Sequence, residues 1–145
     1  MVLELIALLC AGLFAGAAVY VTLVEHPARL ECGPAVALAE FRPSYRRGAV
    51  MQAALAAIGL LTAVGAWALG QGVPALVAGL SLGALIPFTL LVILPTNKRL
   101  LDSRLDPHST EAPALLARWG RLHMVRTVAG VVAFVLLALD LARTL

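Results

Sequence analysis

Six polar or ionisable residues stand at the ends of long apolar runs, where such groups are costly if the runs cross a membrane. They are Glu25, His26, Tyr45, Asn97, His123 and Arg126. His123 and Arg126 are three positions apart and share a helix face, with Trp119 one turn earlier. These residue types supply a general base, a donor to a developing oxyanion and an aromatic wall. We therefore predict that they meet in one polar pocket.

A metal site is an alternative interpretation of the same residues. Glu25, His26 and His123 offer two imidazoles and one carboxylate, a set that suits a non-haem iron or copper ion. Neighbouring residues point in different directions on a helix, so Glu25 and His26 can bind together only if Pro27 breaks it. The cofactor thus stays open between none, copper and non-haem iron.

Structural roles compete with these functional ones. Glu25 could pair with Arg29 or with Arg126, and we predict Glu25 as the partner of Arg126 because they share a side and a depth. Arg126 could instead extend to the membrane interface, and Asn97 could cap a turn. We expect His108 to be solvated in a loop.

The composition restricts the class of protein. Of the 145 residues, 61% are hydrophobic and 13% are charged, and the mean hydropathy is +0.95. Soluble domains carry about 25% charged residues. These values exclude a disordered chain, a water-soluble globule and a disulfide scaffold, and they favour a small integral membrane protein.

Four continuous apolar runs predict an all-α fold, a four-transmembrane-helix bundle formed by one domain, 1–145. We place the membrane helices at 2–25, 46–69, 73–95 and 119–142, a short interfacial helix at 33–41 and a polar loop at 102–113. Pro87 should kink the third helix and open space beside it. The spacings Gly12/Gly16 and Gly79/Gly83 predict close packing within the chain.

The basic residues predict the orientation. Nine of them fall in the two longer links and one lies beyond the last run, so both termini should be outside and both long loops cytoplasmic. We expect an integral protein of the bacterial cytoplasmic membrane. The positive charge reflects this topology, and no nucleic-acid-binding module is present.

Several segments resemble a known family. They are YVTLVEHPARL at 20–30, Phe41-Arg42-Pro43-Ser44-Tyr45, Ile86-Pro87 with Pro95-Thr96-Asn97, and WGRLHMVR at 119–126. Together they resemble the DUF1772, or anthrone-oxygenase-like, family of small four-helix membrane proteins. The resemblance covers nearly the whole chain. It implies roles for Asn97, Trp119 and Arg126, whereas some relatives carry another residue at the position of His123. Some family members oxidise an anthrone to an anthraquinone, and many have no assigned role.

The main functional hypothesis is a membrane oxidoreductase acting on a flat aromatic or quinone-like substrate. His123 or Glu25 would be the base, and Trp119 and Tyr45 would sandwich the ring. Arg126 and Asn97 would hold the oxyanion.

A non-enzymatic binding or assembly subunit is the alternative. A small transporter is disfavoured because the chain shows no inverted repeat. The expected partners are the lipid bilayer and a small apolar aromatic molecule, and the sequence is compatible with a homo-oligomer.

Overall fold

The computed structural model describes residues 1–70 and 72–144, and every regular element within these ranges is helical. The first of four continuous helices comprises α1 (Val2–Tyr20), the π-turn η1 (Val21–Glu25) and α2 (His26–Glu31). The second is α3 (Pro34–Ala68). The third comprises α4 (Val73–Phe88), the π-turn η2 (Thr89–Ile93) and α5 (Leu94–Leu101), and the fourth is α6 (Glu111–Thr144). The predicted all-α class is confirmed.

All four helices are long and apolar enough to cross a membrane, judged by length and composition. They contain 29 to 35 residues, about 44–52 Å at 1.5 Å per residue, whereas the hydrocarbon core is about 30 Å thick. The helices therefore extend beyond the predicted spans. The separate interfacial helix at 33–41 is wrong, because this segment is the start of α3. The predicted loop at 102–113 is too long, because α6 begins at Glu111.

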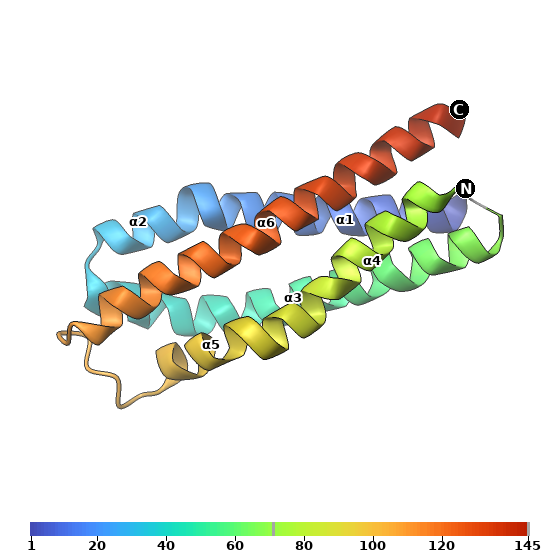
Figure 1. Ribbon diagram of the computed structural model, residues 1–145. Helices are drawn as coiled ribbons and strands as arrows, with labels where there is room; N and C mark the ends of the chain where they lie inside the picture. Colours follow the sequence, from blue (N-terminus) through green and yellow to red (C-terminus); the bar gives the residue numbers. More distant parts are fainter. Residues whose placement is uncertain (71, 145) are drawn as a thin grey trace.

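The helices run up and down around a ring. α1 packs against α3 and α6, and α4 packs against the same two helices, while the diagonal pairs make far fewer contacts. Both termini lie at one end of the bundle, and α2, α5 and the starts of α3 and α6 lie at the other (Figure 1). We call this second end the basic end, because it carries Arg29, Arg42, Arg46, Arg47, Lys98, Arg99, Arg104, Arg118 and Arg121.

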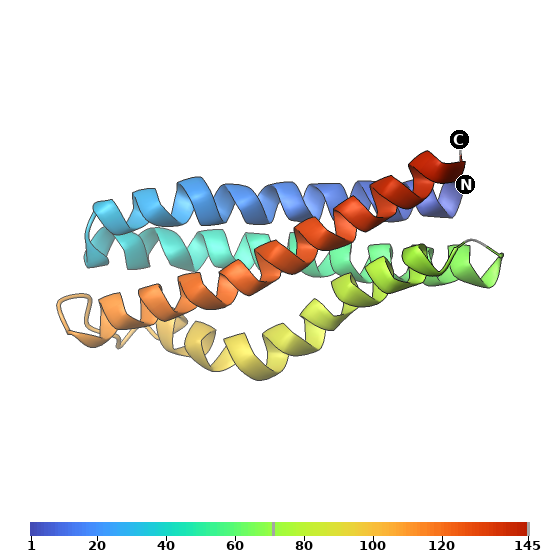
Figure 2. The same ribbon diagram turned by 45° about the horizontal axis from the view of Figure 1, so that its top comes forward.

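Both π-turns end two residues before a proline, η1 before Pro27 and η2 before Pro95. Proline has no N–H to donate to the carbonyl four residues earlier, and a locally widened turn accommodates the missing bond. The helix continues through Pro27 to Glu31 without breaking. The third helix, which also contains Pro87, bends along its course as predicted (Figure 2).

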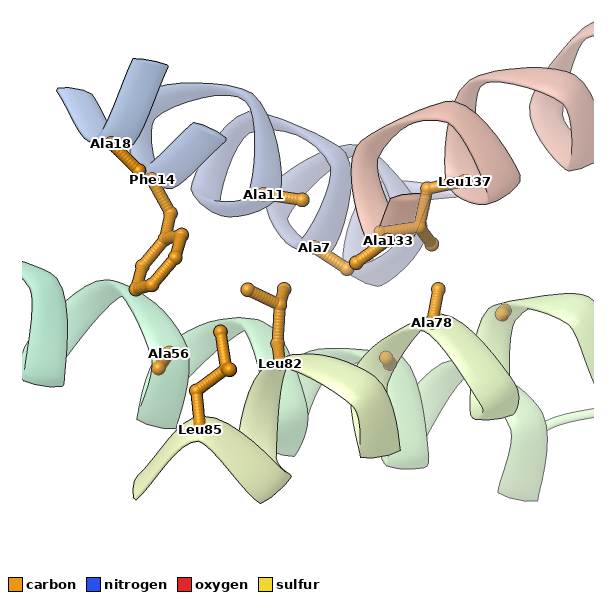
Figure 3. Close-up of a cluster of buried hydrophobic side chains, with 12 residues drawn as sticks. Ala7, Ala11, Phe14, Ala18, Ala56, Ala78, Leu82, Leu85, Ala133 and Leu137 are labelled. Atoms are coloured by element: carbon orange, nitrogen blue, oxygen red, sulfur yellow. The ribbon is translucent and has the colours of Figure 1, made fainter. Parts of the chain in front are cut away.

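The half of the bundle near the termini has a core of small residues. Alanines from all four helices surround Phe14, Leu82, Leu85 and Leu137 (Figure 3). Large apolar side chains point outward instead, and Leu13, Leu61 and Leu91 are more than half exposed. Small residues inside let helix backbones approach, and large residues outside suit contact with lipid.

The predicted close packing of the third helix is also present. A Cβ atom on Gly79 would collide with Ala63, and one on Gly83 would lie 2.7 Å from Leu60. A Cβ atom on Gly16, by contrast, would meet no atom within 4 Å.

A second, more aromatic core lies at the basic end and includes Phe41, Leu100, Leu116 and Trp119. Charged contacts fix its outer edge. Arg99 pairs with Glu111 at 2.6 Å, which joins α5 to the start of α6. The side chain and the backbone N–H of Arg104 donate hydrogen bonds to Asp102 and hold the pKa of that carboxyl at about 2. These contacts position the start of α6, the helix that carries Trp119, His123 and Arg126 further along.

Candidate functional site

A cavity of about 50 Å³ lies between η1, α2, α3 and α6, and we call it the central cavity. Five of the predicted site residues line it: Glu25, Tyr45, Trp119, His123 and Arg126. Along α3 and α6, its polar residues stand between the alanine-rich core and the aromatic core. Its size suits one or two water-sized molecules, since a water molecule occupies about 30 Å³ in the liquid.

Arg126 is buried, with only 8% of its surface exposed, and it reaches α3. Its Nη2 donates a hydrogen bond to Gln52 Oε1 at 2.5 Å, and its Cζ lies 5.6 Å from the centroid of the Phe14 ring. Its Nε has no hydrogen-bond partner within the described part of the chain. The predicted pairing of Arg126 with Glu25 is wrong, because the guanidinium donates to the neutral side-chain amide of Gln52 on α3 instead.

Glu25 belongs to a different polar group. Arg29, one turn further along the same helix, donates to Glu25 and also to Glu40, and Ser44 Oγ donates to Glu25 Oε1 at 2.7 Å. The Arg29 side chain is buried, and its Cζ lies 5.5 Å from the centroid of the Phe41 ring. The pairing of Glu25 with Arg29, one of the two alternatives, is therefore confirmed. The Glu25 carboxylate thus accepts one hydrogen bond from the charged Arg29 and one from the neutral Ser44 hydroxyl.

His123 is 4% exposed and stacks on Trp119, with the two ring centroids 4.7 Å apart. Its Nδ1 lies 3.1 Å from Thr22 Oγ1, and that oxygen lies 2.7 Å from Thr127 Oγ1. The hydroxyl of Thr127 also lies 3.3 Å from the carbonyl oxygen of Ala18 and 3.2 Å from that of His123. Two hydroxyls from α6 and η1 thus adjoin one edge of the imidazole.

Two arrangements of protons fit the contacts between these hydroxyls and His123. If Thr127 donates to a backbone carbonyl oxygen, Thr22 donates to Thr127 and the imidazole carries its proton on Nδ1. If Thr127 donates to Thr22, Thr22 donates to Nδ1 and the proton lies on Nε2. In the first arrangement, Nε2 is the atom that can act as a base.

Tyr45 and Asn97 form a hydrogen-bonded pair at the wall of the central cavity. Asn97 Nδ2 donates to Tyr45 Oη at 2.8 Å, and Asn97 is completely buried. The ring of Tyr45 stacks on Phe41, with centroids 5.5 Å apart. Tyr45 lines the cavity and Asn97 does not. Asn97 therefore reaches the cavity only through the tyrosine hydroxyl.

His26 contacts Trp119 but does not line the central cavity. Its ring centroid is 5.1 Å from that of Trp119, and it packs against Gly120, where a Cβ atom would lie 2.6 Å from Nε2. Within the described ranges, no three His, Cys, Asp or Glu side chains gather closely enough to hold a metal ion. A site built from Glu25, His26 and His123 stays a prediction without support from this geometry.

A second cavity of about 170 Å³ lies between α3 and the α4–η2 bend, and we call it the lateral cavity. Its walls are mostly apolar, and they include Ala53, Leu85 and Leu90. Tyr45, Ala49, Gln52 and Arg126 line both cavities. The two cavities therefore adjoin at these four residues.

The sequence analysis missed three residues that hold the site together: Thr22, Gln52 and Thr127. Gln52 had a usable signal, because it is the strongly polar residue of an otherwise apolar run. Thr127 stands one turn after His123 on α6, and Thr22 had no signal, since only the contact of η1 with α6 brings it to these two residues.

Comparisons with known proteins place these observations in context. A family model described as "Anthrone oxygenase" matches residues 41–136, a range that contains Tyr45, Gln52, Asn97, His123 and Arg126. A curated relative from Aspergillus fumigatus, "Anthrone oxygenase tpcL", is 37% identical over 62 residues, which cover 41% of this chain. The match spans 38% of that relative's length. No solved structure matches the chain.

Proposed function

The chain belongs to the anthrone oxygenase family, and from this premise we propose that it is a membrane-embedded oxygenase acting on a flat aromatic substrate of the anthrone type. The observation that carries the proposal is the central cavity, where His123 and Arg126 lie beside Trp119 in an otherwise apolar bundle. The sequence similarity to a protein named an anthrone oxygenase supports the same reaction class.

His123 would begin the reaction as a general base. Its Nε2 takes a proton from the methylene carbon opposite the anthrone carbonyl, and the electron pair left behind delocalises onto the carbonyl oxygen. This role uses the tautomer with its proton on Nδ1, in which Nδ1 donates to Thr22 and Nε2 is free to accept. General bases of this kind contribute about 10²- to 10⁴-fold in rate.

Arg126 would hold the oxyanion that forms. Its guanidinium is buried and has an unpartnered Nε within the described residues, so it has donor capacity to spare. Fixed donors at a developing charge are worth most where water is excluded. Trp119 and Tyr45 would contact the rings, and Asn97 would orient the Tyr45 hydroxyl. Glu25 would balance the charge of Arg29 beside the cavity.

Molecular oxygen would be the oxidant. The carbanion is oxidised as it transfers electrons to O₂, and a carbon–oxygen bond forms to give a hydroperoxide after the proton returns from His123. Loss of one water molecule then yields the second carbonyl. The balance is one anthrone and one O₂ to one anthraquinone and one water.

The test is turnover of anthrone by purified protein in lipid nanodiscs, with spontaneous oxidation subtracted and O₂ consumption recorded. His123→Ala should lower the rate at least about 100-fold, because the base is lost. His108→Ala removes a histidine from the loop before α6 and should leave the rate unchanged. Metal content is measured on the same samples. Normal turnover by folded His123→Ala protein would refute the proposed role.

A binding or assembly subunit is the second candidate. It is favoured by the internal partners of the polar residues, since Arg126 bonds to Gln52 and His123 contacts Thr22. On this alternative, wild-type protein would show no turnover, and His123→Ala would lower thermal stability. The two measurements together separate the candidates.

A further inference from the structure

The central cavity is too small for the substrate that the proposed function requires. Its volume is about 50 Å³, whereas an apolar cavity of about 150 Å³ holds a single benzene molecule. Three fused rings therefore cannot lie within it. A water molecule or a dioxygen molecule fits this space.

The lateral cavity is larger than the central cavity, and its walls are mostly apolar. It measures about 170 Å³, enough for one aromatic ring, and most of its lining is alanine, leucine, isoleucine and phenylalanine. It lies beside the bend at which Pro87 precedes the π-turn η2. Two of its lining residues, Ala53 and Leu90, are exposed on the outer surface of the bundle, where large apolar side chains face outward.

The inner end of the lateral cavity is polar. Tyr45, Gln52 and Arg126 stand there and also line the central cavity. Arg126 is more than nine-tenths buried, and its Nε lacks a partner within the described residues. A carbonyl or phenolate oxygen at this end would complete its hydrogen bonding, while one apolar ring would fill the remainder and the other rings would lie at the mouth.

We propose that the lateral cavity is the ring-binding subsite for a flat aromatic ketone, which enters from the bilayer between α3 and the α4–η2 bend with its oxygen toward Arg126. Arg126 lines both cavities, so the bound oxygen lies at their shared boundary. This inference rests on the proposed function, and it adds where the substrate binds and from which phase it comes.

The test uses anthraquinone as the probe and the melting temperature of purified protein as the readout, because a ligand that binds the folded state raises it. Ala53→Phe fills the mouth of the lateral cavity. Ala54→Phe is the matched control, since Ala54 is the next exposed alanine of α3 and does not line the cavity. Ala53→Phe should need at least tenfold more anthraquinone for the same shift, and Ala54→Phe should behave as wild type.

A second pair of variants tests the same cavity, so that the result does not depend on the folding of Ala53→Phe alone. Leu90→Trp narrows the mouth, and Leu91→Trp changes its more exposed neighbour outside the cavity. Each variant's melting temperature without ligand is measured first. Identical ligand curves for wild type and for both Ala53→Phe and Leu90→Trp would overturn the inference, as would a wild type that shows no shift.

The outcomes also separate this inference from the proposed function. If the shift depends on Ala53 but anthrone is not consumed, the subsite stands and the oxygenase proposal fails. If Ala53→Phe oxidises anthrone with an unchanged KM, the oxygenase proposal stands and the subsite is wrong.

Discussion

Replacing Gln52 by leucine should destabilise the bundle because it leaves a buried guanidinium without its acceptor. Arg126 is 8% exposed, and its hydrogen bond to Gln52 measures 2.5 Å. Side-chain hydrogen bonds in membrane proteins average about 0.6 kcal/mol. A bond to a charged group is worth about 1.5–3 kcal/mol. The charge and the short distance favour the second range, and we expect Gln52→Leu to cost about 2 kcal/mol.

Changing Gln52 and Arg126 together should cost less stability than the sum of the two single changes. A buried charge without a partner costs more than the absence of both groups. Arg126→Leu in the Gln52→Leu background should therefore restore part of the stability. Gln52→Glu keeps an acceptor oxygen and should retain stability, while Arg143→Leu changes an exposed arginine and should have little effect.

The assay is reversible unfolding in mixed detergent micelles, followed by circular dichroism for the four proteins of a double-mutant cycle. We expect a coupling energy of about 1.5–2 kcal/mol between positions 52 and 126. Strictly additive effects, with a coupling below about 0.5 kcal/mol, would refute the account. Arg126 would then gain its stability from contacts other than Gln52.

Two further predictions concern packing and orientation. Gly79→Ala should destabilise the bundle by roughly 1–3 kcal/mol, because its Cβ atom collides with Ala63. Gly16→Ala should be neutral or stabilising, because a Cβ atom there meets open space. Thermal unfolding of both variants checks this prediction, and equal effects would contradict it. A reporter active only in the cytoplasm should give no signal when fused to the C-terminus, because nine basic residues mark the opposite end as cytoplasmic. A strong signal would reverse the orientation.

The helices were predictable because lipid imposes a local rule on the chain. Backbone groups in a membrane must bond within their own helix, so four long apolar runs predict four helices without knowledge of their packing. The ends were less predictable. The segment at 33–41 was predicted as a separate interfacial helix, and residues 34–41 form the start of α3 instead. Residues 111–113 were predicted as loop, and they begin α6, where Arg99 pairs with Glu111.

The lining of the central cavity was predictable in part, and the pairing of its residues was not, since His26 and Asn97 do not line it. Glu25, Tyr45, Trp119, His123 and Arg126 stand out because polar or aromatic residues at helix ends in a membrane are unusual, and all five line one cavity. Side and depth also suggested Glu25 for Arg126, and this was wrong. The rotation of each helix about its axis decides which residue faces which across the bundle, and it gives Arg126 to Gln52. Glu25 instead pairs with Arg29, one turn along its own helix.

The sequence by itself determined the helical class, the four long apolar helices and the gathering of polar residues at one end, because each follows from composition and from distance along the chain. Only the tertiary structure decided how that end is divided. The contact of η1 with α6 brings Thr22 to His123 and Thr127, and the bend after Pro87 leaves a cavity beside Arg126. Such contacts depend on packing between distant segments, where small residues set how closely helices approach, and no local pattern of residues encodes that distance.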